Sequence, residues 1–134
     1  MKIVILLTMI FFHIIDDFVL QDVLAKLKQK SYWKEYVEKN SHYRYDYIVA
    51  LLAHSFEWAF MILIPVFIFW SKSEMNYFNE NLIQILIVMF LNVIIHAFVD
   101  HLKANELIIN LIEDQFIHLI QVFVTWFVLI MVYT

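Results

Sequence analysis

Histidine and aspartate residues recur four positions apart in the apolar parts of this chain of 134 residues. Three pairs have this spacing: His13 and Asp17, His96 and Asp100, and Asp114 and His118. Residues four apart on an α-helix lie on one face, so each pair brings an imidazole beside a carboxylate. Both groups are ligands for divalent metal ions. The repeated spacing therefore predicts a metal-binding or catalytic site built from several helices.

The predicted metal ligands are these three pairs together with a histidine in the second apolar run: His13, Asp17, His54, His96, Asp100, Asp114 and His118. Asp17 or Glu57 would take a proton from metal-bound water, and Lys103 would hold an anionic group of the substrate. Three amides on the same polar faces are expected to orient the ligands or the substrate by hydrogen bonds: Gln21, Asn92 and Gln115.

Four long apolar runs must position these polar residues. Hydrophobic residues make up 63% of the chain and charged residues only 16%, which excludes an ordinary soluble globule because soluble domains are roughly 45–50% apolar. A membrane-spanning helix needs about 20 predominantly apolar residues. We therefore predict one all-α domain over residues 1–134, an integral membrane four-helix bundle. Its helices are expected at residues 3–29, 47–70, 82–102 and 107–133.

Two residue types are missing from the sequence, and their absence narrows the chemistry. There is no glycine, so the glycine-rich loops that bind nucleotide phosphates cannot form. There is no cysteine, which leaves histidine, carboxylate and neutral oxygen as ligands. Zinc accepts histidine and carboxylate without cysteine and is the metal we expect. The number of candidate ligands is enough for one or two ions. The net charge of −4 argues against nucleic acid as a partner.

The segment between the first two apolar runs, residues 21–46, carries most of the basic residues: Lys26, Lys28, Lys30, Lys34, Lys39 and Arg44. Basic residues favour the cytoplasmic side, so we predict an inner-membrane protein with this segment in the cytoplasm and both termini outside. Tyrosine and tryptophan residues are interspersed with the lysines, which is typical of an amphipathic loop lying along the lipid headgroups. His42 is expected to be solvated there.

In this topology the predicted ligands all lie in the cytoplasmic half of the bilayer. An ionisable group inside a membrane costs about 2.5–3.5 kcal/mol, so the four helices are expected to turn these groups toward one cavity that holds a cation. Asp16 and His101 lie off the polar faces and are expected at the membrane interface.

The function favoured by these features is a metal-dependent hydrolase that acts on a lipid or a phosphoester from the cytoplasmic face. The alternative is a non-enzymatic protein: a proton or ion pathway, or a membrane-interaction protein of phage or defence type. The outer halves of the helices carry few polar residues, which favours a one-sided site over a channel. The sequence leaves a homo-oligomer open.

The polar residues also fall into four ordered motifs. The first is H-x-x-x-D-F-x-L-Q at residues 13–21, and the second is His54. The third is H-x-x-x-D-x-x-K at residues 96–103, and the fourth is D-Q-x-x-H at residues 114–118. Together they resemble the small bacterial and phage membrane proteins grouped as domain of unknown function 3307. A looser similarity is to membrane-bound metal-dependent hydrolases, whose H-R-x-x-T-H-S segment is missing here.

Overall fold

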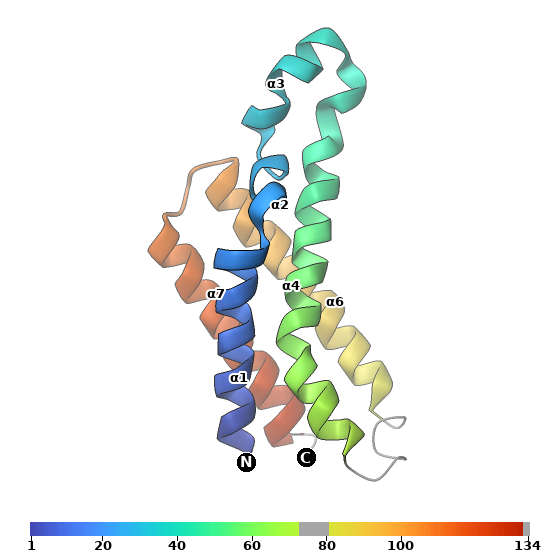
Figure 1. Ribbon diagram of the computed structural model, residues 1–134, viewed down its shortest axis with the longest axis vertical. Helices are drawn as coiled ribbons and strands as arrows, with labels where there is room; N and C mark the ends of the chain where they lie inside the picture. The colour runs from blue at the N-terminus through green and yellow to red at the C-terminus, as the bar shows by residue number, and fades with distance from the viewer. Residues whose placement is uncertain (73–80, 133–134) are drawn as a thin grey trace.

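The computed structural model describes residues 1–72 and 81–132, which form helices and short connections with no β-strand among them. In chain order the elements are α1 (Lys2–Ile15), the π-helical turn η1 (Asp16–Leu20), α2 (Asp22–Leu27), α3 (Lys30–Lys39), the 3-10 turn η2 (Ser41–Tyr45), α4 (Asp46–Ser71), α6 (Leu82–Ala104), α7 (Leu111–Trp126) and the π-helical turn η3 (Phe127–Val132) (Figure 1). The all-helical prediction is confirmed for this part of the chain.

Four of the described helices are long and apolar enough to cross a membrane, as the apolar runs predicted. They are Lys2–Leu20, Ser41–Ser71, Leu82–Ala104 and Leu111–Val132. Their mean hydropathies over the best window are 2.3, 1.8, 2.5 and 2.0. Large apolar side chains are exposed along their outer faces, for example Phe11, Phe90 and Phe116, which is the pattern of helices surrounded by lipid rather than water.

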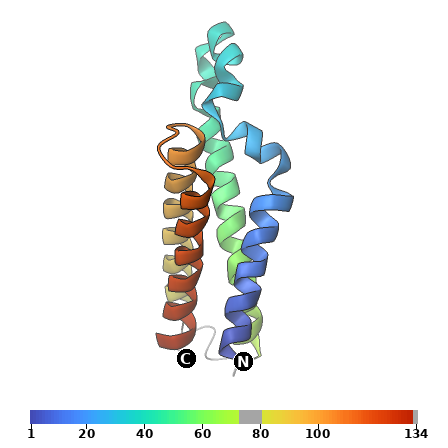
Figure 2. The same ribbon diagram turned by 90° about the vertical axis from the view of Figure 1, so that its left-hand side faces the viewer.

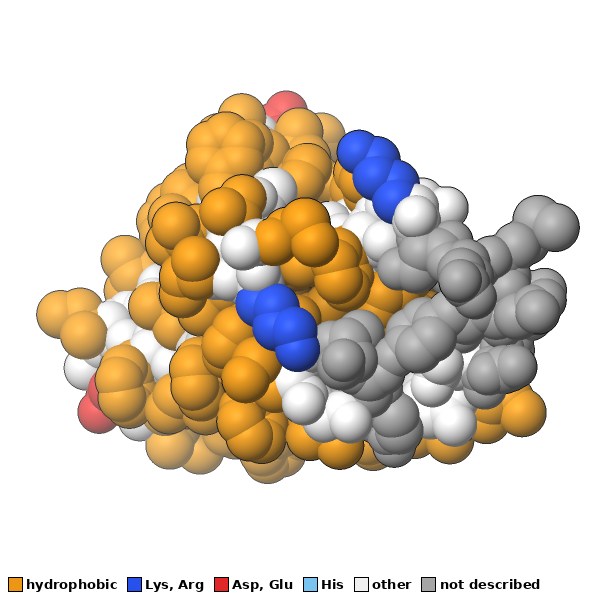
Figure 3. All heavy atoms as spheres, turned by 90° about the horizontal axis from the view of Figure 1, so that it is seen from below, with side chains coloured by type: hydrophobic (Ala, Val, Ile, Leu, Met, Phe, Trp, Pro, Cys, Tyr) orange, Lys and Arg blue, Asp and Glu red, His pale blue; other side chains and the backbone are white. Residues whose placement is uncertain are grey.

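The four long helices form a closed bundle. α4 packs against α1 and α6, and α7 packs against the same two helices (Figures 1 and 2). Both termini lie at one end of the bundle. An apolar core fills this end, with Ile62, Leu63 and Val66 of α4 fully buried against residues such as Ile85 and Leu129. Viewed from that end, hydrophobic side chains cover most of the surface that the described residues form (Figure 3).

The sequence predicted a first helix that continues to residue 29, but α1 ends at Ile15. The segment 21–46, predicted as a loop, contains α2, α3 and η2. After η1 the chain forms α2 and then breaks before α3, where Gln29 has an extended backbone (φ −96°, ψ 127°). A second break at Asn40 precedes η2 (φ −155°, ψ 118°). Glycine and proline, the usual signals of such breaks, are absent at both places. α3 and the start of α4 project beyond the bundle at the end opposite the termini.

The last long helix begins at Leu111 rather than at residue 107. Asn110 caps it: its side chain accepts hydrogen bonds from the backbone of Ile112 (2.8 Å) and Glu113 (3.1 Å). The Glu113 side chain in turn accepts from the Asn110 backbone at 2.8 Å, which completes a capping box. Leu107 has a positive φ of 55°, so the chain before the cap is a turn and not helix.

Candidate metal centre

Side chains from all four long helices converge inside the bundle, on the side away from the termini. Seven histidines and aspartates there are at most 3% exposed: His13, Asp16, His54, His96, Asp100, Asp114 and His118. The Asp17 side chain is also only 3% exposed. The convergence that the shared depth of these residues predicted is therefore present in the fold.

Two overlapping groups in this cluster have the geometry to hold a metal ion. One is Asp17, His54 and His96, and the other is His96, Asp100 and His118. In each group, one ligand atom from each residue lies within 4.8 Å of the others. Five of the seven predicted ligands are thus brought together, and His96 belongs to both groups.

The distances between ligand atoms match those around a small divalent ion. His54 Nε2 lies 3.2 Å from His96 Nε2, and Asp100 Oδ2 lies 3.5 Å from the first and 3.7 Å from the second. Asp17 Oδ1 lies 3.6 Å from His54 Nε2. Ligand atoms of a tetrahedral zinc ion, each about 2.0–2.1 Å from the metal, are about 3.3 Å apart. Small adjustments of these side chains would therefore bring His54, His96 and Asp100 to zinc-binding distance and leave the fourth position to Asp17 or to water.

Asp16 is a site residue that the sequence analysis placed wrongly, at the interface. It is 1% exposed, and its Oδ2 lies 3.7 Å from His54 Nδ1. Neither carboxylate oxygen has a hydrogen-bond partner among the described residues. A carboxylate at Nδ1 fixes the ring of a histidine whose Nε2 binds metal. Glu57, one turn after His54, is half-buried and within electrostatic range of Asp16.

The π-helical turn η1 explains the error. In a regular α-helix, adjacent residues point about 100° apart, so the analysis of polar faces placed Asp17 on the inner face and Asp16 beside it. The wider π turn that starts at Asp16 brings both side chains inward. Such turns are frequent at functional sites.

His13 has a different partner from the one predicted. Its Nδ1 accepts a hydrogen bond of 2.8 Å from Trp58 Nε1, and the same atom is 3.6 Å from Asp17 Oδ2. His13 is in neither group of metal-binding geometry among the described residues. The hydrogen bond from Trp58 occupies Nδ1 and anchors α1 to α4 at this point.

Lys28 belongs to the cluster and was missed, because the sequence analysis assigned it to the solvated basic segment. Its ammonium lies 2.5 Å from Asp100 Oδ2, and the residue is only 7% exposed. Asn105 fixes the backbone at this point by donating to the Lys28 carbonyl (3.0 Å). The break between α2 and α3 turns Lys28 inward, and no local sequence signal marks that break.

Two predicted amides and Lys103 contact the carboxylates. Gln115 Nε2 donates to Asp17 Oδ2 (2.9 Å) and to Asp114 Oδ2 (3.1 Å), and Gln21 Nε2 donates to Asp17 Oδ1 (3.3 Å). Lys103 Nζ lies 2.6 Å from Asp114 Oδ2. The amides are therefore placed to orient Asp17, whereas the ammonium of Lys103 is paired with Asp114. Asp114 is outside both metal-binding groups.

The third predicted amide, Asn92, lies deeper in the bundle and contacts no candidate ligand directly. Its side-chain Nδ2 donates to Thr125 Oγ1 (2.8 Å), and its backbone carbonyl accepts from Gln121 Nε2 (2.8 Å). Gln121 Oε1 is 3.4 Å from His118 Nδ1. The Asn92 side chain therefore joins α6 to α7 through Thr125, and its backbone carbonyl holds the Gln121 amide that lies beside His118.

The fold and this cluster define an all-helical bundle of four membrane-length helices around a buried His/Asp centre. No protein-family model, curated protein or solved structure matches the chain.

Proposed function

We propose that this chain is an integral membrane protein whose His/Asp centre binds one divalent metal ion, zinc by its ligand chemistry, and hydrolyses a lipid or other phosphoester or amide. The observation that carries the proposal is the meeting of His54, His96 and Asp100 with ligand-atom distances of 3.2–3.7 Å inside a buried cluster.

The charge of the cluster supports a cation. Its buried carboxylates are Asp16, Asp17, Asp100 and Asp114. The ammonium groups paired with them are Lys28 and Lys103. If all four carboxylates are ionised and all histidines are neutral, two negative charges have no ammonium partner, and such charges are costly away from water. One divalent ion would neutralise both.

The shared histidine supports one ion rather than two. His96 is common to both metal-binding groups, and its contacts with His54 and Asp100 are both made through Nε2. One imidazole nitrogen has a single lone pair for a metal. The two groups are then alternative positions of the same ion, and His118 is a ligand in only one of them.

A zinc ion in such a site would lower the pKa of bound water toward neutrality. Asp16 would hold the His54 ring, and Gln115 would hold the Asp17 carboxylate. Asp17 and Glu57 remain our candidates for accepting the proton of the attacking water. Substrate would reach the centre from the end of the bundle opposite the termini.

Membrane insertion is part of the proposal. The exposed apolar faces of the four long helices support it, and the basic segment 21–46 supports a cytoplasmic position for the end opposite the termini. We propose an inner-membrane location with both termini outside. Membership in domain of unknown function 3307 is likewise a proposal, and it is supported by the fact that residues from all four motifs meet in one cluster.

A proton relay is the second candidate, since two protonated histidines would also neutralise the cluster. The orphaned Nδ1 atoms of His54 and His96, both buried without a hydrogen-bond partner among the described residues, favour it. The fully buried apolar core of Ile62, Leu63 and Val66 near the termini weighs against a path across the whole bundle. We therefore give the metal centre preference.

Elemental analysis of the purified protein tests the proposal. We expect one zinc per chain, lost in His96→Gln and in His54→Gln. His42→Gln, at an exposed position outside the cluster, and His13→Gln, which keeps an acceptor for Trp58, should both retain it. Wild-type protein without metal after incubation with zinc would refute the metal centre. Labelled lipid extracts incubated with and without chelator would then test hydrolysis, and unchanged lipids would refute the reaction.

A further inference from the structure

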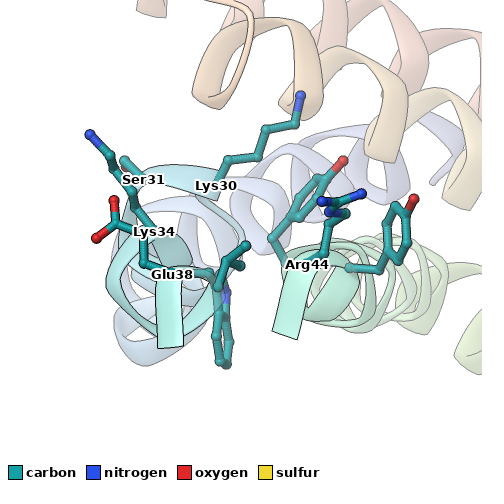
Figure 4. Close-up of a pocket in the computed structure, with 9 residues that line it drawn as sticks. Lys30, Ser31, Lys34, Glu38 and Arg44 are labelled. Carbon is teal, nitrogen blue, oxygen red and sulfur yellow. The ribbon is translucent and has the colours of Figure 1, made fainter. Parts of the chain in front are cut away.

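A cavity of about 470 Å³ lies outside the metal centre, between α3 and the start of α4 (Figure 4). We call it the α3–α4 pocket. Its lining includes three cations, one carboxylate and three aromatic residues: Lys30, Lys34, Arg44, Glu38, Trp33, Tyr45 and Tyr47. It belongs to the part of the molecule that projects beyond the bundle.

Aromatic contacts give this pocket a fixed wall. Trp33 Nε1 donates a hydrogen bond of 2.7 Å to the Leu27 carbonyl. The Trp33 ring stacks on Tyr43, with ring centroids 6.3 Å apart and an interplanar angle of 14°. These contacts join α3 to η2, so the pocket is preformed although the hairpin stands apart from the main core.

The charges of the pocket leave a cation available for a ligand. Lys30 is already bound to Glu106 at 2.7 Å, and this bond raises the pKa of Lys30. Lys34 and Glu38 lie together on the outer side of α3, away from Arg44. Arg44 has no carboxylate within ion-pair distance in the part of the chain that the structure describes. Its guanidinium is therefore the group in this pocket best placed for an anion.

The pocket begins at the level where α6 ends. Tyr47, on its wall, stacks on His101 of the last turn of α6, with centroids 6.0 Å apart. Lys30 pairs with Glu106 just beyond that helix. In an inserted bundle this level is the membrane–water interface, where tyrosine and tryptophan gather and where phospholipid phosphates lie. The cytoplasmic leaflet, which we assign to this side, is rich in anionic lipids.

We propose that the α3–α4 pocket binds the phosphate headgroup of an anionic phospholipid. Arg44 forms paired hydrogen bonds with the phosphate oxygens, a geometry that suits the guanidinium fork. The aromatic wall contacts the glycerol and the first methylene groups. The proposal rests on the membrane insertion proposed above but not on the metal centre, which none of the pocket residues contributes to.

Native mass spectrometry of protein from nanodiscs tests this directly. The discs contain phosphatidylcholine and phosphatidylglycerol in equal amounts, and the measurement is the ratio of the two lipids that stay bound. Wild type should retain mainly phosphatidylglycerol, and Arg44→Gln should lower the ratio about tenfold. Lys39→Gln is the matched control, because it removes the same charge from the exposed end of α3 outside the pocket. Equal ratios in Arg44→Gln and Lys39→Gln would overturn the proposal.

Two further measurements test the paired contact of Arg44 and distinguish a lipid headgroup from free phosphate. Arg44→Lys keeps the charge and loses the fork, so an intermediate ratio is expected; an unchanged ratio would overturn the paired contact. Millimolar inorganic phosphate should leave the bound lipid in place, and its displacement of the lipid would mean that the ligand is a free phosphate. Resistance to carbonate extraction and zinc content are measured on each variant, so that failure of insertion or of the metal centre is distinguished from failure of this site.

Discussion

At the scale of single residues, the Lys28 ammonium competes with a metal ion for Asp100 Oδ2. This oxygen lies 2.5 Å from the Lys28 ammonium and 3.5 Å from His54 Nε2, so the oxygen that would bind the metal already holds a cation. Unit charges about 4 Å apart interact by about 4 kcal/mol in a partly polarisable interior. Lys28 and a bound metal ion therefore repel each other.

Replacing Lys28 should strengthen metal binding. We expect Lys28→Met to raise zinc affinity at least about tenfold, because the competing charge is removed while an apolar chain of similar length fills its place. The metal-free variant should melt at a lower temperature than metal-free wild type, since Asp100 then lacks its partner. Competition with a chromophoric chelator gives the affinity and thermal melts give the stability. Lys26→Met, at an exposed position of α2, is the control, and weaker zinc binding in Lys28→Met would contradict this account.

At the scale of elements, the π turn η1 determines how α1 contributes to the site. It directs Asp16 toward His54 Nδ1 (3.7 Å) while Asp17 faces His54 Nε2 (3.6 Å). The two ring nitrogens of His54 thus each lie near one of two adjacent carboxylates.

Asp16→Asn tests this arrangement. The amide keeps the shape but loses the negative charge that lies 3.7 Å from His54 Nδ1, so zinc affinity should fall about 10- to 100-fold. The stoichiometry of one ion should be preserved at high zinc, because no ligand in either group is removed. Isothermal titration of both proteins measures the change. Asp22→Asn, at an exposed position of α2, should bind like wild type; an Asp16→Asn variant with unchanged affinity would place Asp16 outside the centre.

The same elements show what the sequence could and could not predict. The four apolar runs predicted the long helices, and the spacing of four residues predicted that His96 and Asp100 share a face, because both features depend on local periodicity. The common depth of the polar residues in these helices predicted that His54 would meet them. Asp16 and Lys28 were out of reach. Their positions depend on a π turn and on an extended Gln29, which arise from tertiary packing and carry no glycine, proline or capping signal.

At the scale of the whole molecule, polarity is divided between two ends. The apolar core lies with the termini, and the His/Asp cluster and the basic hairpin lie toward the opposite end. In an inserted bundle with this division the centre lies nearer one side of the membrane, and the basic residues support our proposal that this side is cytoplasmic. The orientation in the membrane therefore decides which pool of substrates the protein can meet.

Labelling of single cysteines with a membrane-impermeant maleimide tests the orientation, and the absence of native cysteine makes each variant unambiguous. Lys28 is unsuitable as a probe because it is buried, whereas Lys34 on α3 and Ser71 at the end of α4 are both exposed. We expect Lys34→Cys to react only in inside-out vesicles and Ser71→Cys only in intact spheroplasts. The positions lie at opposite ends of the helix pair, so each is the other's control. The reverse pattern would place the metal centre on the outer side, and labelling of both from one side would exclude a spanning bundle.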